Sequence, residues 1–102
     1  KGKILENILF LQLKRTGKEV YYYKNKNECD FVVKEGTKIT QAIQVCSALD
    51  DANKERELNG LVEALNMFRL KEGLLLTADQ TEDISIHGKK IRIVPAFRWI
   101  LE

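Results

Sequence analysis

The sequence predicts one domain of the mixed α/β class, in which helices flank a mixed sheet. Three observations lead to this prediction. Two segments carry apolar residues at helical spacing, several short runs are rich in β-forming residues, and turn residues separate these runs. The expected order is a helix, three strands, a second helix and a fourth strand, followed by a hairpin and a short closing helix.

The first half of the chain is expected to hold one helix and three strands. Apolar residues recur at helical spacing through 4–13, and Gly17 follows as a stop signal. The stretch 24–27 contains two asparagines and predicts a hairpin turn, because Asn tolerates the left-handed region. The expected strands lie at 20–23, 29–34 and 38–46.

The second helix has the clearest pattern in the chain. Its apolar stripe consists of Leu58, Leu61, Val62, Leu65 and Phe68. The polar residues expected mostly on its other faces are Lys54, Glu55, Glu57, Glu63 and Asn66.

The remaining elements form the end of the chain. The continuous apolar run 73–77 is typical of a strand buried on both faces. A hairpin of 84–86 and 91–94 is expected to turn at His87 and Gly88. The closing helix at 96–101 is expected to dock Phe97, Trp99 and Ile100.

Composition excludes several classes of protein. The chain has 102 residues, of which 44% are hydrophobic and 31% charged, as is ordinary for a globular domain. No run approaches the roughly 18 apolar residues of a membrane span. Because a domain with this much apolar sequence does not need a disulfide framework, we expect Cys29 and Cys46 to be free thiols in a reducing compartment, the cytoplasm. They also lack the C-x-x-C spacing of a redox motif. Because the sequence begins at Lys1 and a helix follows at once, we expect the C-terminal part of a larger protein.

Positive charge is concentrated at the beginning of the chain. Residues 1–26 contain seven Lys or Arg and two Glu. This excess could favour a polyanion such as a nucleic acid, although a solvated helix face followed by a turn is the simpler explanation.

Four residues interrupt the apolar pattern where chemistry could occur. Glu6 lies along the buried edge of the first expected helix, where a carboxylate is costly unless it is paired, hydrogen-bonded or bound to a metal. Asp30 interrupts an apolar strand. Gln44 and Cys46 share one face of the third strand, because side chains alternate along a strand. Each also has a structural explanation: Glu6 as a helix-terminal charge, Asp30 as an acceptor for backbone amides, and the other two as core residues.

This arrangement resembles the PD-(D/E)xK nucleases, which have a restriction-endonuclease-like fold. Their plan places an acid on the first helix, an Asp on the second strand and an acid-x-Lys on the third. The resemblance implies that Glu6, Asp30 and Gln44 hold Mg²⁺ or Mn²⁺, which activates a water for attack on a phosphodiester. In that plan the Lys stabilises the developing charge.

A closer resemblance covers the whole chain. It is similar to an uncharacterised domain at the C-terminal end of archaeal and bacterial AAA+-type ATPases. The runs that carry it are 2–7 (GKILEN), 21–25 (YYYKN), 30–33 (DFVV), 43–46 (IQVC), 54–57 (KERE) and 93–97 (IVPAF). The resemblance implies an ATPase module as partner within the same parent chain. No phosphate-binding loop occurs here, so an ATP site would lie outside this piece.

The chain departs from the nuclease pattern at two positions. Gln44 keeps an oxygen ligand but lacks the negative charge, and Cys46 occupies the place of the Lys. Some members of the superfamily move the Lys elsewhere, and Lys54 and Arg56 at the start of the second helix are the candidates for such a migration.

We therefore expect a nuclease-like accessory or regulatory module of an AAA+-type ATP-binding protein, with a degenerate metal site. The alternatives are an active metal-dependent DNA or RNA phosphodiesterase and a non-catalytic nucleic-acid-binding domain. No membrane is expected as partner, and the oligomeric state stays open.

Overall fold

The computed structural model describes residues 3–102 and has the element order expected from the sequence. A helix is followed by three strands, a second helix, three more strands and a short closing helix. The elements are α1 (Lys3–Arg15), β1 (Glu19–Lys24), β2 (Glu28–Glu35), β3 (Lys38–Val45), α2 (Lys54–Met67), β4 (Glu72–Thr77), β5 (Glu82–Ile86), β6 (Lys89–Pro95) and α3 (Ala96–Leu101).

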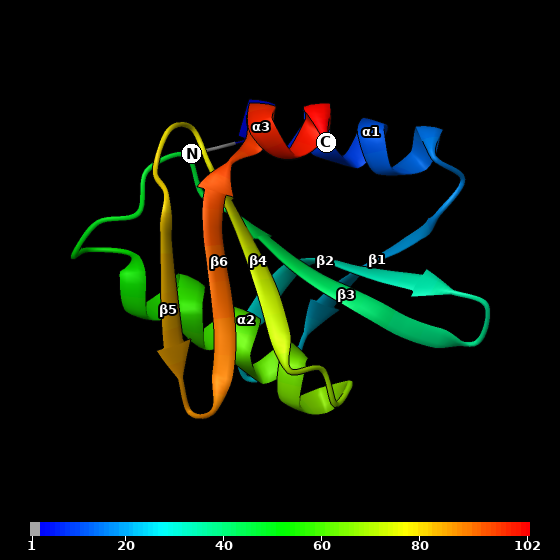
Figure 1. Ribbon diagram of the computed structural model, residues 1–102. Coiled ribbons are helices and arrows are strands. Elements are labelled where there is room, and N and C mark those ends of the chain that lie inside the picture. Colours follow the sequence, from blue (N-terminus) through cyan, green and yellow to red (C-terminus); the bar gives the residue numbers. More distant parts are fainter. Residues whose placement is uncertain (1–2) are drawn as a thin grey trace.

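The six strands form one mixed sheet in the order β1-β2-β3-β4-β6-β5. The strands β1, β2 and β3 are antiparallel neighbours, β3, β4 and β6 are parallel neighbours, and β5 returns antiparallel to β6. Helix α2 covers one face of the sheet, whereas α1 and α3 lie on the other (Figure 1). The central strand β4 is therefore covered on both sides, which confirms the prediction from its continuous apolar run.

A hydrophobic core fills each side of the sheet. Between α2 and the sheet, the fully buried residues Leu61, Leu65 and Ile91 belong to one cluster. Between the sheet and the helices α1 and α3, Leu9 and Ile43 belong to a second cluster. The two cysteines are buried and unpaired, as expected. Among the described residues, no helix is long and apolar enough to cross a membrane.

The hairpin turn between β1 and β2 lies where the sequence predicts it, but for a different reason. Neither Asn25 nor Asn27 has a positive φ, so the proposed left-handed asparagine was wrong. The turn is held instead by Glu63 of α2, whose carboxylate accepts hydrogen bonds from the backbone N–H groups of Lys26 (3.2 Å) and Asn27 (2.9 Å). The side chains of Asn27 and Tyr23 donate to the same carboxylate, each over 2.8 Å.

The apolar residues of the two terminal helices are buried only in part. On α1, Leu9 and Leu13 are buried and Leu5 packs against the core, while Ile4 and Ile8 are exposed. On α3, Trp99 and Ile100 pack against the core, but Phe97 is 61% exposed, so the expectation that it docks was wrong. The reason is geometric, because a helix of six residues can turn only one side to the sheet.

Helix α2 approaches the sheet most closely at Gly60. A β-carbon at this position would overlap the backbone carbonyl oxygen of Glu28 in β2 and would lie 2.8 Å from Nε2 of Gln44 in β3. Only a residue without a side chain allows the helix to lie this close to the strand backbone.

We therefore expect Gly60→Ala to destabilise the fold. Alanine improves helix propensity by about 1 kcal/mol, but overpacking costs about 1–3 kcal/mol or more. Since the overlap here involves rigid backbone, the net loss in the free energy of unfolding should be about 2 kcal/mol. Chemical denaturation measures it, with Asn59→Ala on the exposed side of α2 as the control. Equal stability of the two variants would contradict this close contact.

Candidate functional site

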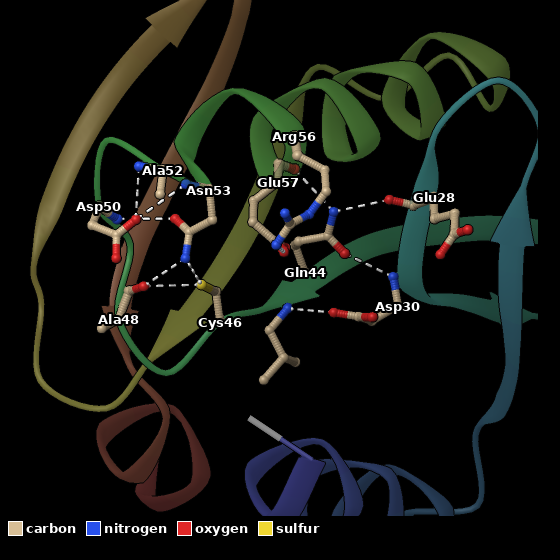
Figure 2. A network of polar contacts seen from close by, with 11 residues as sticks. Glu28, Asp30, Gln44, Cys46, Ala48, Asp50, Ala52, Asn53, Arg56 and Glu57 are labelled. Atoms are coloured by element: carbon tan, nitrogen blue, oxygen red, sulfur yellow. Dashed lines mark hydrogen bonds and ion pairs between the residues drawn. The ribbon is translucent and has the colours of Figure 1, made fainter. Parts of the chain in front are cut away.

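The candidate site lies where β2 and β3 separate, beyond the pair Phe31 and Ile43, and we call this place the fork. Their backbone ladder runs from the pair Glu35 and Lys38 to the pair Phe31 and Ile43 and then stops. Beyond it, side chains replace the missing ladder bonds. The N–H of Asp30 donates to Oε1 of Gln44 over 2.8 Å, and the carboxylate of Asp30 accepts from the N–H of Val45 over 2.8 Å (Figure 2).

An irregularity in β2 directs Asp30 into this fork. Tyr21 of β1 pairs with Val32, whereas Tyr23 pairs with Cys29, so β2 contains one more residue than β1 between these pairs. An extra residue of this kind bends a strand and redirects a side chain. It also breaks the alternation along the strand, because Cys29 and Val32 both belong to the core beneath α2.

Gln44 fastens three elements together. Its Oε1 accepts from β2, while its Nε2 donates to the carbonyl of Glu28 in β2 (3.0 Å) and to the carbonyl of Glu57 in α2 (2.9 Å). The residue is only 2% exposed. Both amide hydrogens are thus engaged by backbone, and the amide oxygen points at the N–H of Asp30.

Acidic side chains from two helices, α1 and α2, lie near Asp30. Burial and the nearby carboxylates of Glu6 in α1 and Glu57 in α2 together raise the pKa of Asp30 to about 7, against the opposing effect of the hydrogen bond from the N–H of Val45. The structure therefore brings Glu6 and Asp30 close together, as the sequence suggests.

A small cleft opens beside this fork. Its volume is about 280 Å³, and Lys26, Asn27, Glu28, Asp30, Gln44, Arg56 and Glu57 line it. Of the two candidate cations, Arg56 is among these lining residues and Lys54 is not. The guanidinium of Arg56 lies 3.2 Å from the carboxylate of Glu57, whose side chain is only 16% exposed, against 66% for Arg56.

Cys46 lies apart from the cleft, in the loop that connects β3 to α2. Its thiol donates to the carbonyl of Ala48 (3.2 Å) and receives a hydrogen bond from Nδ2 of Asn53 (3.4 Å). Burial raises the pKa of this thiol. Figure 2 shows Cys46, Ala48 and Asn53 as one group and Gln44 with Asp30 as another. The residue at the expected lysine position therefore stabilises a loop.

The described residues do not form a ready-made metal centre. Within 3–102, no three or more His, Cys, Asp or Glu side chains are grouped so that they could hold a metal ion. Two of the three expected ligands, Glu6 and Asp30, are neighbours. The third, Gln44, directs its oxygen to a backbone N–H.

The sequence pattern did not lead us to expect Glu57 and Gly60 at this site. Glu57 was expected on an outer face of α2, yet its side chain is largely buried. A signal was available, because Glu57 precedes the buried Gly60 and Leu61 by three and four residues and so shares their side of the helix. A glycine inside an amphipathic helix is likewise a signal for close approach of another backbone.

Gln44→Glu tests whether the amide serves the scaffold. A carboxylate cannot donate to the carbonyls of Glu28 and Glu57, and it adds negative charge beside Asp30. The loss of two hydrogen bonds costs about 1 kcal/mol each, and the buried charge adds to this cost, so the free energy of unfolding should fall by at least about 2 kcal/mol. The control is Gln41→Glu, at an exposed position of the same strand. A Gln44→Glu variant as stable as this control would contradict the scaffold role.

Asp30→Asn tests the electrostatics of the fork. Because the folded pKa is about 7 and the ordinary value 3.8, the folded state keeps the proton that the unfolded chain releases near pH 4. The contribution of Asp30 to stability is therefore full below about pH 4 and is lost as the pH rises through 7.

Asparagine cannot ionise but keeps an oxygen for the N–H of Val45. We expect Asp30→Asn to flatten the dependence of unfolding free energy on pH between 4 and 8, with a relative gain on the order of 2 kcal/mol at pH 8. Asp83→Asn, at an exposed position of β5, is the control. Parallel curves for wild type and Asp30→Asn would show that Asp30 ionises normally.

Comparison with known proteins places the chain in a family without an assigned activity. Over 112 aligned residues it is 37% identical to the uncharacterised protein MJ1544 of Methanocaldococcus jannaschii. The alignment covers 99% of this chain but only 25% of that protein, at its C-terminal end. A family model described as a domain of unknown function, DUF4143, matches residues 1–99. The chain therefore belongs to the DUF4143 family.

Proposed function

We propose that this domain is a nuclease-like accessory module that no longer cleaves phosphodiesters and that serves a longer ATP-binding chain. The observation that carries the proposal is the engagement of Gln44, whose amide is committed to three hydrogen bonds with the backbone of β2 and α2. A side chain used in this way supports the sheet. Its oxygen already accepts a hydrogen bond from the N–H of Asp30 and is not directed toward a catalytic metal.

The positions of three residues support the nuclease-like part of the proposal. Glu6 on the first helix, Asp30 on the second strand and Gln44 on the third follow the PD-(D/E)xK plan, and Glu6 and Gln44 both lie next to Asp30. The fork between β2 and β3 is where such a plan would gather its ligands.

The surroundings of Cys46 support the loss of activity. A metal-dependent nuclease needs oxygen ligands for the cation and a positive charge for the developing negative charge. The thiol at the lysine position is buried, held in a loop and kept protonated by a raised pKa. It can supply neither charge nor an oxygen.

A second candidate, an active Mg²⁺-dependent nuclease, is favoured by the three converging acids. The carboxylates of Glu6 and Glu57 repel that of Asp30, as the raised pKa of Asp30 indicates, and a divalent cation would relieve this repulsion. Arg56 at the rim of the cleft would then act in place of the missing Lys.

The longer chain is proposed by analogy with the relative, of which this chain matches about a quarter. The sequence lacks a phosphate-binding loop, so the ATP-binding function belongs to the proposed remainder of that chain.

A nuclease assay on the purified full chain separates the two candidates. With Mg²⁺ or Mn²⁺ and single- or double-stranded DNA or RNA, we expect no cleavage by the wild type above that of Asp30→Asn, which retains the hydrogen bond to β3. Metal-dependent cleavage that disappears in Asp30→Asn but persists in Gln41→Ala would establish the active nuclease instead.

A further inference from the structure

Helix α1 presents an apolar stripe to solvent. Ile4 is 77% exposed, Ile8 47% and Leu11 60%. The spacing of four and three residues places these side chains one above another on a single side of the helix. This side is opposite to the one that buries Leu9 and Leu13 in the core.

Helix α3 adds two more large apolar side chains. Phe97 is 61% exposed and Leu101 82% exposed, and they are four residues apart on the same side of the helix. The two helices lie next to each other on the same face of the sheet (Figure 1). We call Ile4, Ile8, Leu11, Phe97 and Leu101 together the α1/α3 face. Single exposed apolar residues are ordinary, but a group of this kind marks an interaction site.

The charges of these helices are mostly positive. The exposed charged side chains of residues 3–15 and 96–102 are Lys3, Lys14, Arg15, Arg98 and Glu102. Glu6, the acid of α1, lies instead beside Asp30 at the fork. A partner that complements this surface is therefore apolar in its centre and acidic at its border.

We propose that the α1/α3 face is the surface by which this domain docks onto the part of its own chain that precedes it. The inference rests on the proposed function, in which the domain belongs to a longer protein, and it names the surface that the two parts share. In the relative from Methanocaldococcus jannaschii, three quarters of the chain lie outside the matched region.

The position of α1 favours a partner within the same chain. This helix begins at Lys3, so a preceding segment is tethered within a few residues of Ile4. Such a tether gives the preceding segment a high effective concentration at this face. A second copy of the chain or a separate protein would lack this advantage.

The rate of thiol modification in the full chain tests the proposal. A thiol introduced by Leu11→Cys, on the α1/α3 face, is compared with one introduced by Asn59→Cys, on the exposed side of α2. The two cysteines of this domain, Cys29 and Cys46, are buried, and any cysteines in the preceding part of the chain are first replaced by serine. We expect a maleimide to modify the Leu11→Cys chain at least tenfold more slowly than the Asn59→Cys chain, and both at similar rates after unfolding in urea.

A charge variant tests the acidic border of the partner. Lys14→Glu together with Arg15→Glu should raise the modification rate of the Leu11→Cys chain toward that of the control, whereas Lys71→Glu, in the exposed connection between α2 and β4, should not. Glutamates three and four residues from the thiol would by themselves lower its thiolate fraction and slow the reaction, so a faster reaction in this variant indicates release of the partner. A rate that stays low or falls would contradict the acidic border.

Three results would overturn the proposal. Equal rates for Leu11→Cys and Asn59→Cys would mean that the face is open in the full chain. Protection that disappears on dilution would assign the face to a second copy, and protection that appears only with phosphatidylglycerol vesicles would assign it to a membrane surface. Each result is independent of the nuclease assay, so failure of this inference is distinguishable from failure of the proposed function.

Discussion

The hydrogen bonds of one buried amide hold the centre of this domain together. Gln44 joins β2, β3 and α2 where the backbone ladder between the two strands has ended. Without it, the N–H of Asp30 would lose its acceptor, and the carbonyls of Glu28 and Glu57 would each lose a hydrogen bond, and such losses in a buried region are costly. The bare backbone of Gly60 allows α2 to come near enough for these bonds. The packing of Leu61 and Leu65 of α2 against the sheet depends on the same approach.

The electrostatics of the fork follow from this packing. Because α2 and α1 lie on opposite faces of the sheet, each brings a carboxylate to Asp30 from its own side. Burial and mutual repulsion then favour the protonated form of Asp30. The same arrangement would favour the binding of a cation. Two features argue for a structural role instead: the amide of Gln44 is fully hydrogen-bonded to backbone, and Cys46 stands at the position of the Lys.

Periodicity in the sequence was enough to predict the order of the elements and the covered central strand. It also pointed to Glu6 and Asp30, because a carboxylate within an apolar pattern is conspicuous. The hydrogen bonds of Gln44 could not be predicted, since they depend on which backbone groups the bend in β2 leaves unpaired. Phe97 was misjudged because apolar character alone does not say whether a neighbouring surface exists to cover it.

The close approach at Gly60 also limits which sequences this fold can accept. A β-carbon at position 60 would first overlap the backbone carbonyl oxygen of Glu28, and this backbone is present whatever side chain stands at position 44. An exchange of Gln44 therefore cannot make room for a side chain at position 60. Related chains should keep glycine at this position even where the residue at position 44, and with it the chemistry of the site, differs.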